Sequence, residues 1–166
     1  MLDGHSFKGT AASEIEEEAK LKVKESDLIN MSELALEDDP ESSSESLQQR
    51  QRTDKRQKTT HQETERLEKG VYPSPGACDE FIPLFLCQKR LTKRHMNWLK
   101  GKATGLRDEG ENITLKLVPL HKAWREAARD AKALAALGLY ENLKREGKIP
   151  SMPREVEEEP EELSSQ

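Results

Sequence analysis

A cysteine and a histidine near the middle of the chain are the first candidates for chemistry. Cys87 and His95 fall on one face of a helix predicted over residues 83–100, where buried-type side chains recur at steps of three and four. A thiol next to an imidazole is a common nucleophile and base pair. These two side chains are about two helical turns apart, too far for the hydrogen bond that such a pair needs. We therefore predict that both pack in a core and that the chain has no catalytic residue.

Other signals of catalysis or of metal binding are also missing from the sequence. Two cysteines without further ligands at metal spacing give neither a disulfide scaffold nor a zinc site. No glycine-rich loop follows a strand, and no serine has the sequence context of a nucleophile elbow. We therefore predict that the protein is not an enzyme and that it has no metal, no cofactor and no small-molecule substrate.

The segment from Cys78 to Cys87 reads CDEFIPLFLC. It resembles the cysteine-paired helices of small mitochondrial intermembrane-space proteins, and its CxxxIPLxxC pattern is similar to that of a respiratory complex I accessory subunit. The resemblance covers about ten residues and implies a small mitochondrial respiratory-complex subunit. Here eight residues separate the cysteines instead of nine, and a second pair is missing. Because Cα atoms nine residues apart on a helix are about 13 Å apart, one helix cannot form the disulfide, and this reading is kept only as an alternative.

Four basic residues form the strongest candidate for a binding surface. They project from the predicted helix 83–100 on the side opposite Leu84, Cys87 and Leu91, with pairs at i, i+4 spacing. Such a face can follow phosphates, pair with an acidic partner that includes this chain's own tails, or be solvated. Because the chain is acidic overall and has no recognised nucleic-acid motif, we prefer a protein partner and keep nucleic-acid binding as the alternative. The four residues are Lys89, Arg90, Lys93 and Arg94.

Charge is strongly segregated along the 166 residues. Residues 1–49 carry four lysines against thirteen acidic residues, and residues 151–166 carry one arginine against six glutamates. The chain between them is basic. The overall composition is 33% hydrophobic and 36% charged, which is poorer in apolar residues than an ordinary domain. We therefore predict a disordered acidic-then-basic region over 1–75, a helical module over 76–149 and a disordered acidic tail over 150–166.

The expected fold is mostly α, a small module of two or three helices flanked by disordered acidic arms. The second helix is predicted over residues 119–137, ends at Gly138, and is followed by a short helix that ends at Gly147. Residues 113–120 alternate apolar and polar side chains, but without a second strand in view we predict an extended lead-in. Large side chains on the two main helices are the expected anchors for a partner, namely Leu91, Trp98, Leu120, Trp124 and Leu134.

Two motifs in the N-terminal half predict regulation and location. A loose basic cluster in a polar segment is typical of nuclear-import signals, and it consists of Arg50, Arg52, Lys55, Arg56 and Lys58. Serines among acidic residues are typical of phosphorylation sites, here Ser42, Ser43, Ser44 and Ser46.

These features together predict a phosphorylated accessory or adaptor subunit with coiled-coil-like helices. It would dock onto a larger, nuclear multiprotein complex for chromatin, transcription or ribosome assembly. No stretch is apolar enough to span a membrane, so no membrane partner is expected. The cytoplasm is the alternative location, followed by the mitochondrion.

Overall fold

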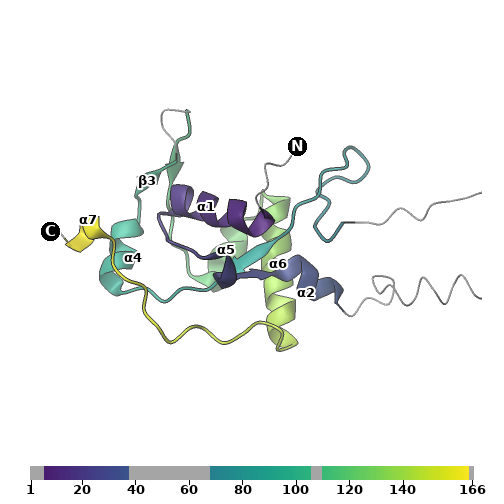
Figure 1. The fold of residues 1–166 in the computed structure, drawn as a ribbon. Helices are drawn as coiled ribbons and strands as arrows, with labels where there is room; N and C mark the ends of the chain where they lie inside the picture. The colour runs from purple at the N-terminus through teal and green to yellow at the C-terminus, as the bar shows by residue number, and fades with distance from the viewer. Residues whose placement is uncertain (1–5, 38–67, 106–109, 165–166) are drawn as a thin grey trace, which may run out of the picture.

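The computed structural model describes residues 6–37, 68–105 and 110–164. These residues form a mixed structure of helices and small two-stranded sheets, with 44% helix (Figure 1). The prediction of a helical protein is confirmed in this coarse form, but the sheets were not expected. The helices are α1 (Phe7–Ala19), α2 (Met31–Leu36), α4 (Lys93–Leu99), α5 (Leu120–Glu126), α6 (Ala131–Arg145) and α7 (Glu161–Ser164), with a 3-10 turn, η1, over Glu25–Asp27. The strands are β1 (Leu28–Asn30), β2 (Phe85–Cys87), β3 (Ala103–Thr104) and β4 (Ile113–Thr114).

The strand pair β1–β2 joins the N-terminal part of the chain to its middle. The strands are antiparallel, with Ile29 opposite Leu86 at the centre of the pairing. The contact continues into α2, because the Met31 amide donates to the Leu84 carbonyl at 2.8 Å and the Leu84 amide donates to the buried Ser32 hydroxyl at 2.9 Å. This network satisfies backbone groups that burial would otherwise leave unpaired.

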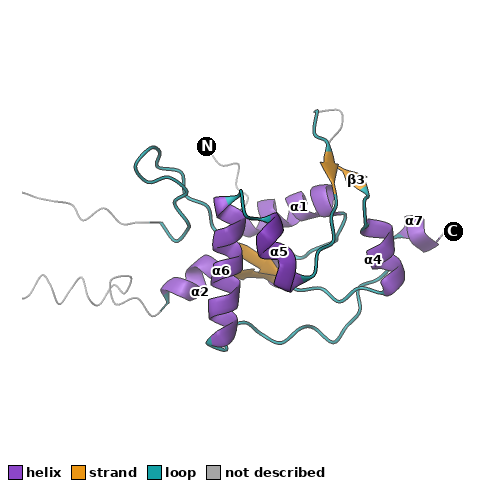
Figure 2. Cartoon of the chain, turned by 180° about the vertical axis from the view of Figure 1, so that it is seen from behind, coloured by secondary structure: helices purple, strands orange, loops and turns teal. Residues whose placement is uncertain are grey.

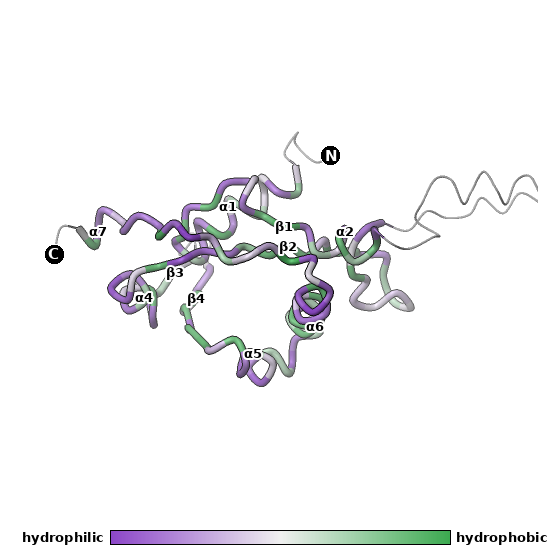
Figure 3. The backbone as a smooth tube through the Cα atoms, turned by 90° about the horizontal axis from the view of Figure 1, so that it is seen from below, coloured by the Kyte–Doolittle hydropathy of each residue, from purple (hydrophilic) through white to green (hydrophobic). Residues whose placement is uncertain are grey.

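Helix α6 covers the β1–β2 pair and contacts α2. Met31, Leu84 and Leu143 form the buried centre, and each is at most 9% exposed. In Figure 3, α1 lies on one side of the β1–β2 pair and α6 lies on the other. Partly buried side chains complete this core, namely Leu34, Val71, Ile82, Leu86, Ala135, Ala136, Leu139, Tyr140 and Ile149.

The single helix predicted over residues 119–137 is wrong, because the structure has two helices there. α5 ends at Glu126, and α6 begins after Asp130, whose carboxylate accepts from the amides of Lys132 and Ala133. A side chain that caps the first free amides of a helix favours a new start over continuation. α6 then runs through Gly138, which is not among the glycines with a positive φ, so this glycine does not end it. The predicted end near Gly147 is confirmed, since α6 stops at Arg145 and Gly147 has a φ of +74°.

The helix predicted over residues 83–100 is also wrong in its first half. Residues 85–87 are strand β2, and the helix in this region, α4, begins only after Thr92. The Thr92 hydroxyl accepts from the His95 amide at 3.0 Å, which caps the start of α4. Likewise, the extended lead-in at 113–120 contains a short strand, β4, because β3 supplies the partner that the sequence did not reveal.

The segments predicted to be disordered arms are part of the packed structure where the structure describes them. The Thr104 hydroxyl donates to the Glu18 carbonyl of α1 at 2.6 Å, and the rings of Phe7 and Phe81 meet edge to face with centroids 6.1 Å apart. At the other end, Leu163 is only 6% exposed. Contacts therefore cross the predicted boundary at residue 76. The division into 1–75, 76–149 and 150–166 stays a prediction, which a pair of core substitutions tests below.

Candidate functional site

A groove with a volume of about 1140 Å³ separates the first part of the chain from the C-terminal segment. One wall comes from α1 and the loop before β1, and includes Glu16, Lys20 and Lys24. The loop after β2 and α4 supply Lys89, Arg90, His95 and Trp98, and residues 150–162 close the groove from the third side. Figure 2 shows this C-terminal chain leaving α6 and running across to α4 and α7.

The C-terminal segment is fastened to the cationic side of the groove. Gln88 Nε2 donates to the Pro150 carbonyl, and Arg90 Nε donates to the Pro153 carbonyl, both at 3.0 Å. The Glu157 amide donates to the Arg90 carbonyl at 2.8 Å. These contacts fix an extended strand-like course for residues 150–157 without a regular sheet.

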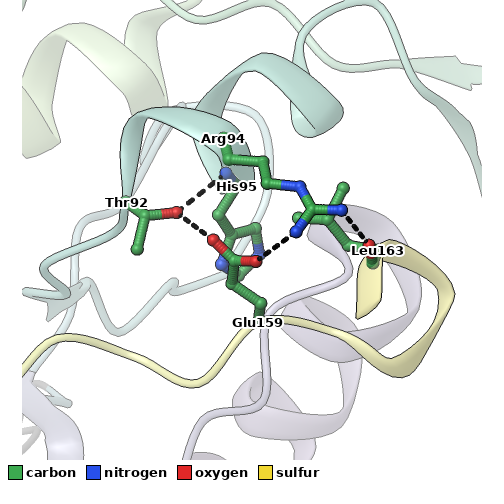
Figure 4. A network of polar contacts seen from close by, with 5 residues as sticks. All are labelled: Thr92, Arg94, His95, Glu159 and Leu163. Atoms are coloured by element: carbon green, nitrogen blue, oxygen red, sulfur yellow. Dashed lines mark hydrogen bonds and ion pairs between the residues drawn. The ribbon is translucent and has the colours of Figure 1, made fainter. Parts of the chain in front are cut away.

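Three carboxylates of this segment each meet a cation. Glu157 Oε2 lies 3.0 Å from Lys89 Nζ, and Glu162 Oε2 lies 3.0 Å from Lys102 Nζ. Glu159 binds at two points, since Thr92 Oγ1 donates to Oε1 at 2.6 Å and Arg94 Nη1 lies 3.4 Å from Oε2 (Figure 4). At these positions, the acidic partner of the basic side chains is therefore the C-terminal segment of the same chain.

The four residues of the predicted basic face do not share one helix. Lys89 and Arg90 lie in the loop after β2, whereas Lys93 and Arg94 belong to α4. Lys89 is bound between Glu157 and Asp27 Oδ2, which is 2.7 Å away. The hydrogen bond from Lys89 holds the pKa of the Asp27 carboxyl below its usual 3.8, and the hydrogen bond to Asp27 raises the pKa of the Lys89 ammonium above its usual 10.5.

The Asp27–Lys89 pair predicts a pH window for stability. Both side chains are less than a third exposed, so we expect Asp27→Asn to lower the free energy of unfolding by about 1 kcal/mol at pH 7. The contribution of Asp27 is complete above pH 3.8 and is lost as the pH falls through its lowered pKa. That of Lys89 is complete below pH 10.5 and is lost as the pH rises through its raised pKa. Urea unfolding at pH 7 and at pH 2.5 measures the difference.

The matched control for this prediction is the Lys116–Glu126 pair, whose side chains are 68% and 51% exposed. Glu126→Gln should change the stability little at either pH, because exposed pairs contribute almost nothing. An Asp27→Asn effect that is equally large at both pH values would show that packing, and not charge, accounts for it.

His95 lies at the bottom of this region with its polar atoms unpaired. The side chain is 2% exposed, and neither ring nitrogen has a hydrogen-bond partner among the described residues. Its ring meets Trp98 edge to face at 5.8 Å, and Lys102 Nζ lies 3.3 Å from the centre of the Trp98 ring. The prediction that His95 is buried is confirmed. Cys87 is partly buried on the neighbouring strand, and its burial raises the pKa of the thiol, so it is a poor nucleophile.

The predicted partner anchors do not form one surface. Trp98 lies on α4 and is partly buried beside the groove, and Leu91 precedes that helix. Leu120 and Trp124 on α5 and Leu134 on α6 are 47%, 52% and 40% exposed. Their role in binding stays a prediction. The basic cluster at 50–58 and the serines at 42–46 lie outside the described residues.

Helix α1 carries a carboxylate face, although its residues belong to the region 1–75 that the sequence predicted to be disordered. Glu14, Glu17 and Glu18 have the i, i+3, i+4 spacing that places side chains on one side of a helix, and all three are exposed. They stand in the last two turns, which contain no basic residue and where negative charge opposes the helix dipole. Glu16 and Lys20, which line the groove, lie on a different side of α1. The carboxylate face and the groove are therefore two separate features.

No family model and no solved structure matches the chain. The chain is 35% identical over 149 residues to a curated protein from Arabidopsis thaliana, Nudix hydrolase 14, chloroplastic. The match covers 90% of this chain and 39% of the relative's length. The described part of the chain contains no helix with the length and hydropathy to cross a membrane.

This similarity to a hydrolase contradicts the function predicted from the sequence. The predicted non-enzymatic adaptor subunit with only protein partners is wrong, and so are the nucleic-acid-binding and respiratory-complex alternatives, the coiled-coil-like character and the exclusion of a small-molecule substrate. The predicted nuclear location is not tested by this similarity. The prediction considered only a nucleophile and a base in the apolar middle of the chain as candidate catalytic groups. The run of glutamates at residues 14–18 was not considered as a candidate site.

Proposed function

We propose that this protein is a hydrolase that cleaves a pyrophosphate bond of a nucleotide. The observation that carries the proposal is the 35% identity over 149 residues to Nudix hydrolase 14. An identity of this size over nine-tenths of the chain supports a shared ancestor. A nucleotide that contains a pyrophosphate bond is a small molecule with two adjacent anionic phosphates. A site that binds it must neutralise the negative charge of these phosphates.

Helix α1 supplies a surface suited to the cation that such a substrate brings. Among the described residues, no three His, Cys, Asp or Glu side chains are grouped so that they hold a metal ion by themselves. Mg²⁺ usually takes one or two protein carboxylates and completes its shell with water and substrate phosphates, so a preformed three-ligand group is not required. The exposed carboxylates of Glu14, Glu17 and Glu18 fit this mode.

The carboxylate face and a polyphosphate are both negative, so each repels the other without a cation between them. A divalent cation held by one or two of these carboxylates would supply neutralisation of the charge on the phosphates. One or two of the carboxylates of Glu14, Glu17 and Glu18 would hold this cation and so place the substrate along α1. The Ser6 hydroxyl, which accepts from the Gly9 amide at 3.1 Å and donates to Glu25 at 2.8 Å, fixes the start of that helix.

The experiment that tests the proposal offers the purified chain a panel of nucleoside diphosphate derivatives with Mg²⁺. Chromatography should show substrate loss and the appearance of a nucleoside monophosphate. Omission of Mg²⁺ should stop the reaction. A panel in which no compound is hydrolysed above the rate without protein would contradict the proposal. The nuclear location rests on the cluster at 50–58 alone and stands as a separate proposal; the word chloroplastic belongs to the relative's name.

A further inference from the structure

The C-terminal segment 155–163 covers cationic residues of the groove and pairs with them as an anionic ligand would. Its carboxylates meet Lys89, Arg94 and Lys102, and Thr92 donates a further hydrogen bond to Glu159. Arg94 also donates to the Leu163 carbonyl at 2.5 Å. A lysine ammonium, an arginine fork and a hydroxyl are the groups with which proteins bind phosphate oxygens.

His95 shows that the peptide does not satisfy the groove completely. Both of its ring nitrogens are buried and unpaired among the described residues, although Glu159 accepts from the Thr92 hydroxyl that also caps the His95 amide (Figure 4). A buried nitrogen without a partner is unfavourable. An anion with more acceptor atoms than a carboxylate, and without a peptide backbone to hold it away, can accept from a ring N–H and from the basic side chains together.

The tail is held by contacts that a competitor can replace. Arg94 and Glu162 are 53% and 73% exposed at their ion pairs, and exposed pairs are weak. Leu163 is the buried apolar anchor at the end of the segment. A segment of the same chain that covers a binding site lowers the apparent affinity for an external ligand, because only molecules with an uncovered site can bind that ligand.

We propose that this groove is a binding site for a small molecule with two adjacent phosphate groups, and that the segment 155–163 covers its cationic residues as an autoinhibitory competitor. The site is distinct from the carboxylate face of α1 and does not depend on hydrolysis. Lys89 and Arg94 bind the phosphates in place of Glu157 and Glu159, and His95 supplies the deepest contact. Trp98 forms the flat wall next to them.

Calorimetric titration of the full chain with inorganic pyrophosphate, at fixed ionic strength, tests the proposal. The variant carries Glu157→Gln, Glu159→Gln and Glu162→Gln. Its affinity for pyrophosphate should exceed that of the unmodified chain by about 3- to 10-fold, because the competitor is weakened. The control carries Glu126→Gln, Glu141→Gln and Glu146→Gln, which remove the same charge from α5, α6 and its end. Its affinity should stay within about twofold of the unmodified chain.

Two further results separate specific binding from general charge. Adding Arg94→Gln to the tail variant should cancel the gain, and pyrophosphate should speed hydrogen exchange at the Glu157 amide, which is bonded to Arg90. Equal affinities of the tail variant and the unmodified chain, or an equal gain in the control, would overturn the proposal. Nucleotide hydrolysis without this gain in affinity would support the proposed function and contradict the binding site in the groove. A gain in affinity without hydrolysis would support the binding site and contradict the proposed function.

Discussion

Replacing Glu17 and Glu18 together with glutamine is expected to lower the rate of nucleotide hydrolysis by about 100-fold or more. Loss of a single group that stabilises developing charge typically costs about that factor in catalytic rate, and both carboxylates belong to the face proposed to hold the substrate's cation. Steady-state kinetics with the best compound of the panel measures the change. Glu141→Gln, an exposed change on α6, is the matched control and should leave the rate unaltered.

The same double change should slightly stabilise the fold. Glu17 and Glu18 lie next to the C-terminus of α1, where negative charge is unfavourable by a few tenths of a kcal/mol to about 1 kcal/mol. A variant that is more resistant to urea but much slower would mark these carboxylates as functional groups that weaken the helix. A variant that keeps full activity would remove the carboxylate face from the proposed mechanism.

Leu143→Ala should lower the free energy of unfolding by about 3 kcal/mol. Leu143 is 3% exposed and lies with Met31 and Leu84 at the centre of the core, and deletion of a buried leucine side chain leaves a cavity that costs about 2–5 kcal/mol. Leu134→Ala, on the same helix but 40% exposed, is the matched control and should cost less than about 1 kcal/mol. Urea unfolding followed by circular dichroism measures both.

Met31→Ala extends this prediction to the boundary at residue 76. Because Met31 is 2% exposed in the same core, its truncation should cost about as much as that of Leu143. Such a loss would show that the segment before residue 76 folds together with α6. An unchanged stability would instead support the separate helical module predicted from the sequence.

The parts of the fold that the sequence predicted are those with local signals. The end of α6 follows from Gly147 with its positive φ, and the burial of His95 follows from its spacing with neighbouring apolar residues. The break between α5 and α6 has a local signal too, the Asp130 cap, but the run of alanines from 127 to 136 favours helix so strongly that it concealed the interruption.

The parts that could not be predicted depend on contacts between distant residues. Strand β2 reads as the start of a helix, and only its pairing with β1, more than fifty residues earlier, makes it a strand. Leu28 and Met31 belong to the region 1–75 that was predicted to be disordered, although they are buried in the structure. Likewise, the acidic tail reads as solvated until Lys89, Arg94 and Lys102 are known to lie beneath it.

The proposed hydrolysis is tested most directly by the fate of the water oxygen. The chain is incubated in ¹⁸O-enriched water with Mg²⁺ and a nucleoside diphosphate derivative that the panel has shown to be a substrate. The products are followed by ³¹P nuclear magnetic resonance. The account predicts one ¹⁸O atom in one of the two phosphate monoesters formed at each turnover, because water attacks a phosphorus of the pyrophosphate bond. Unchanged substrate, or products whose phosphates carry no ¹⁸O, would contradict it.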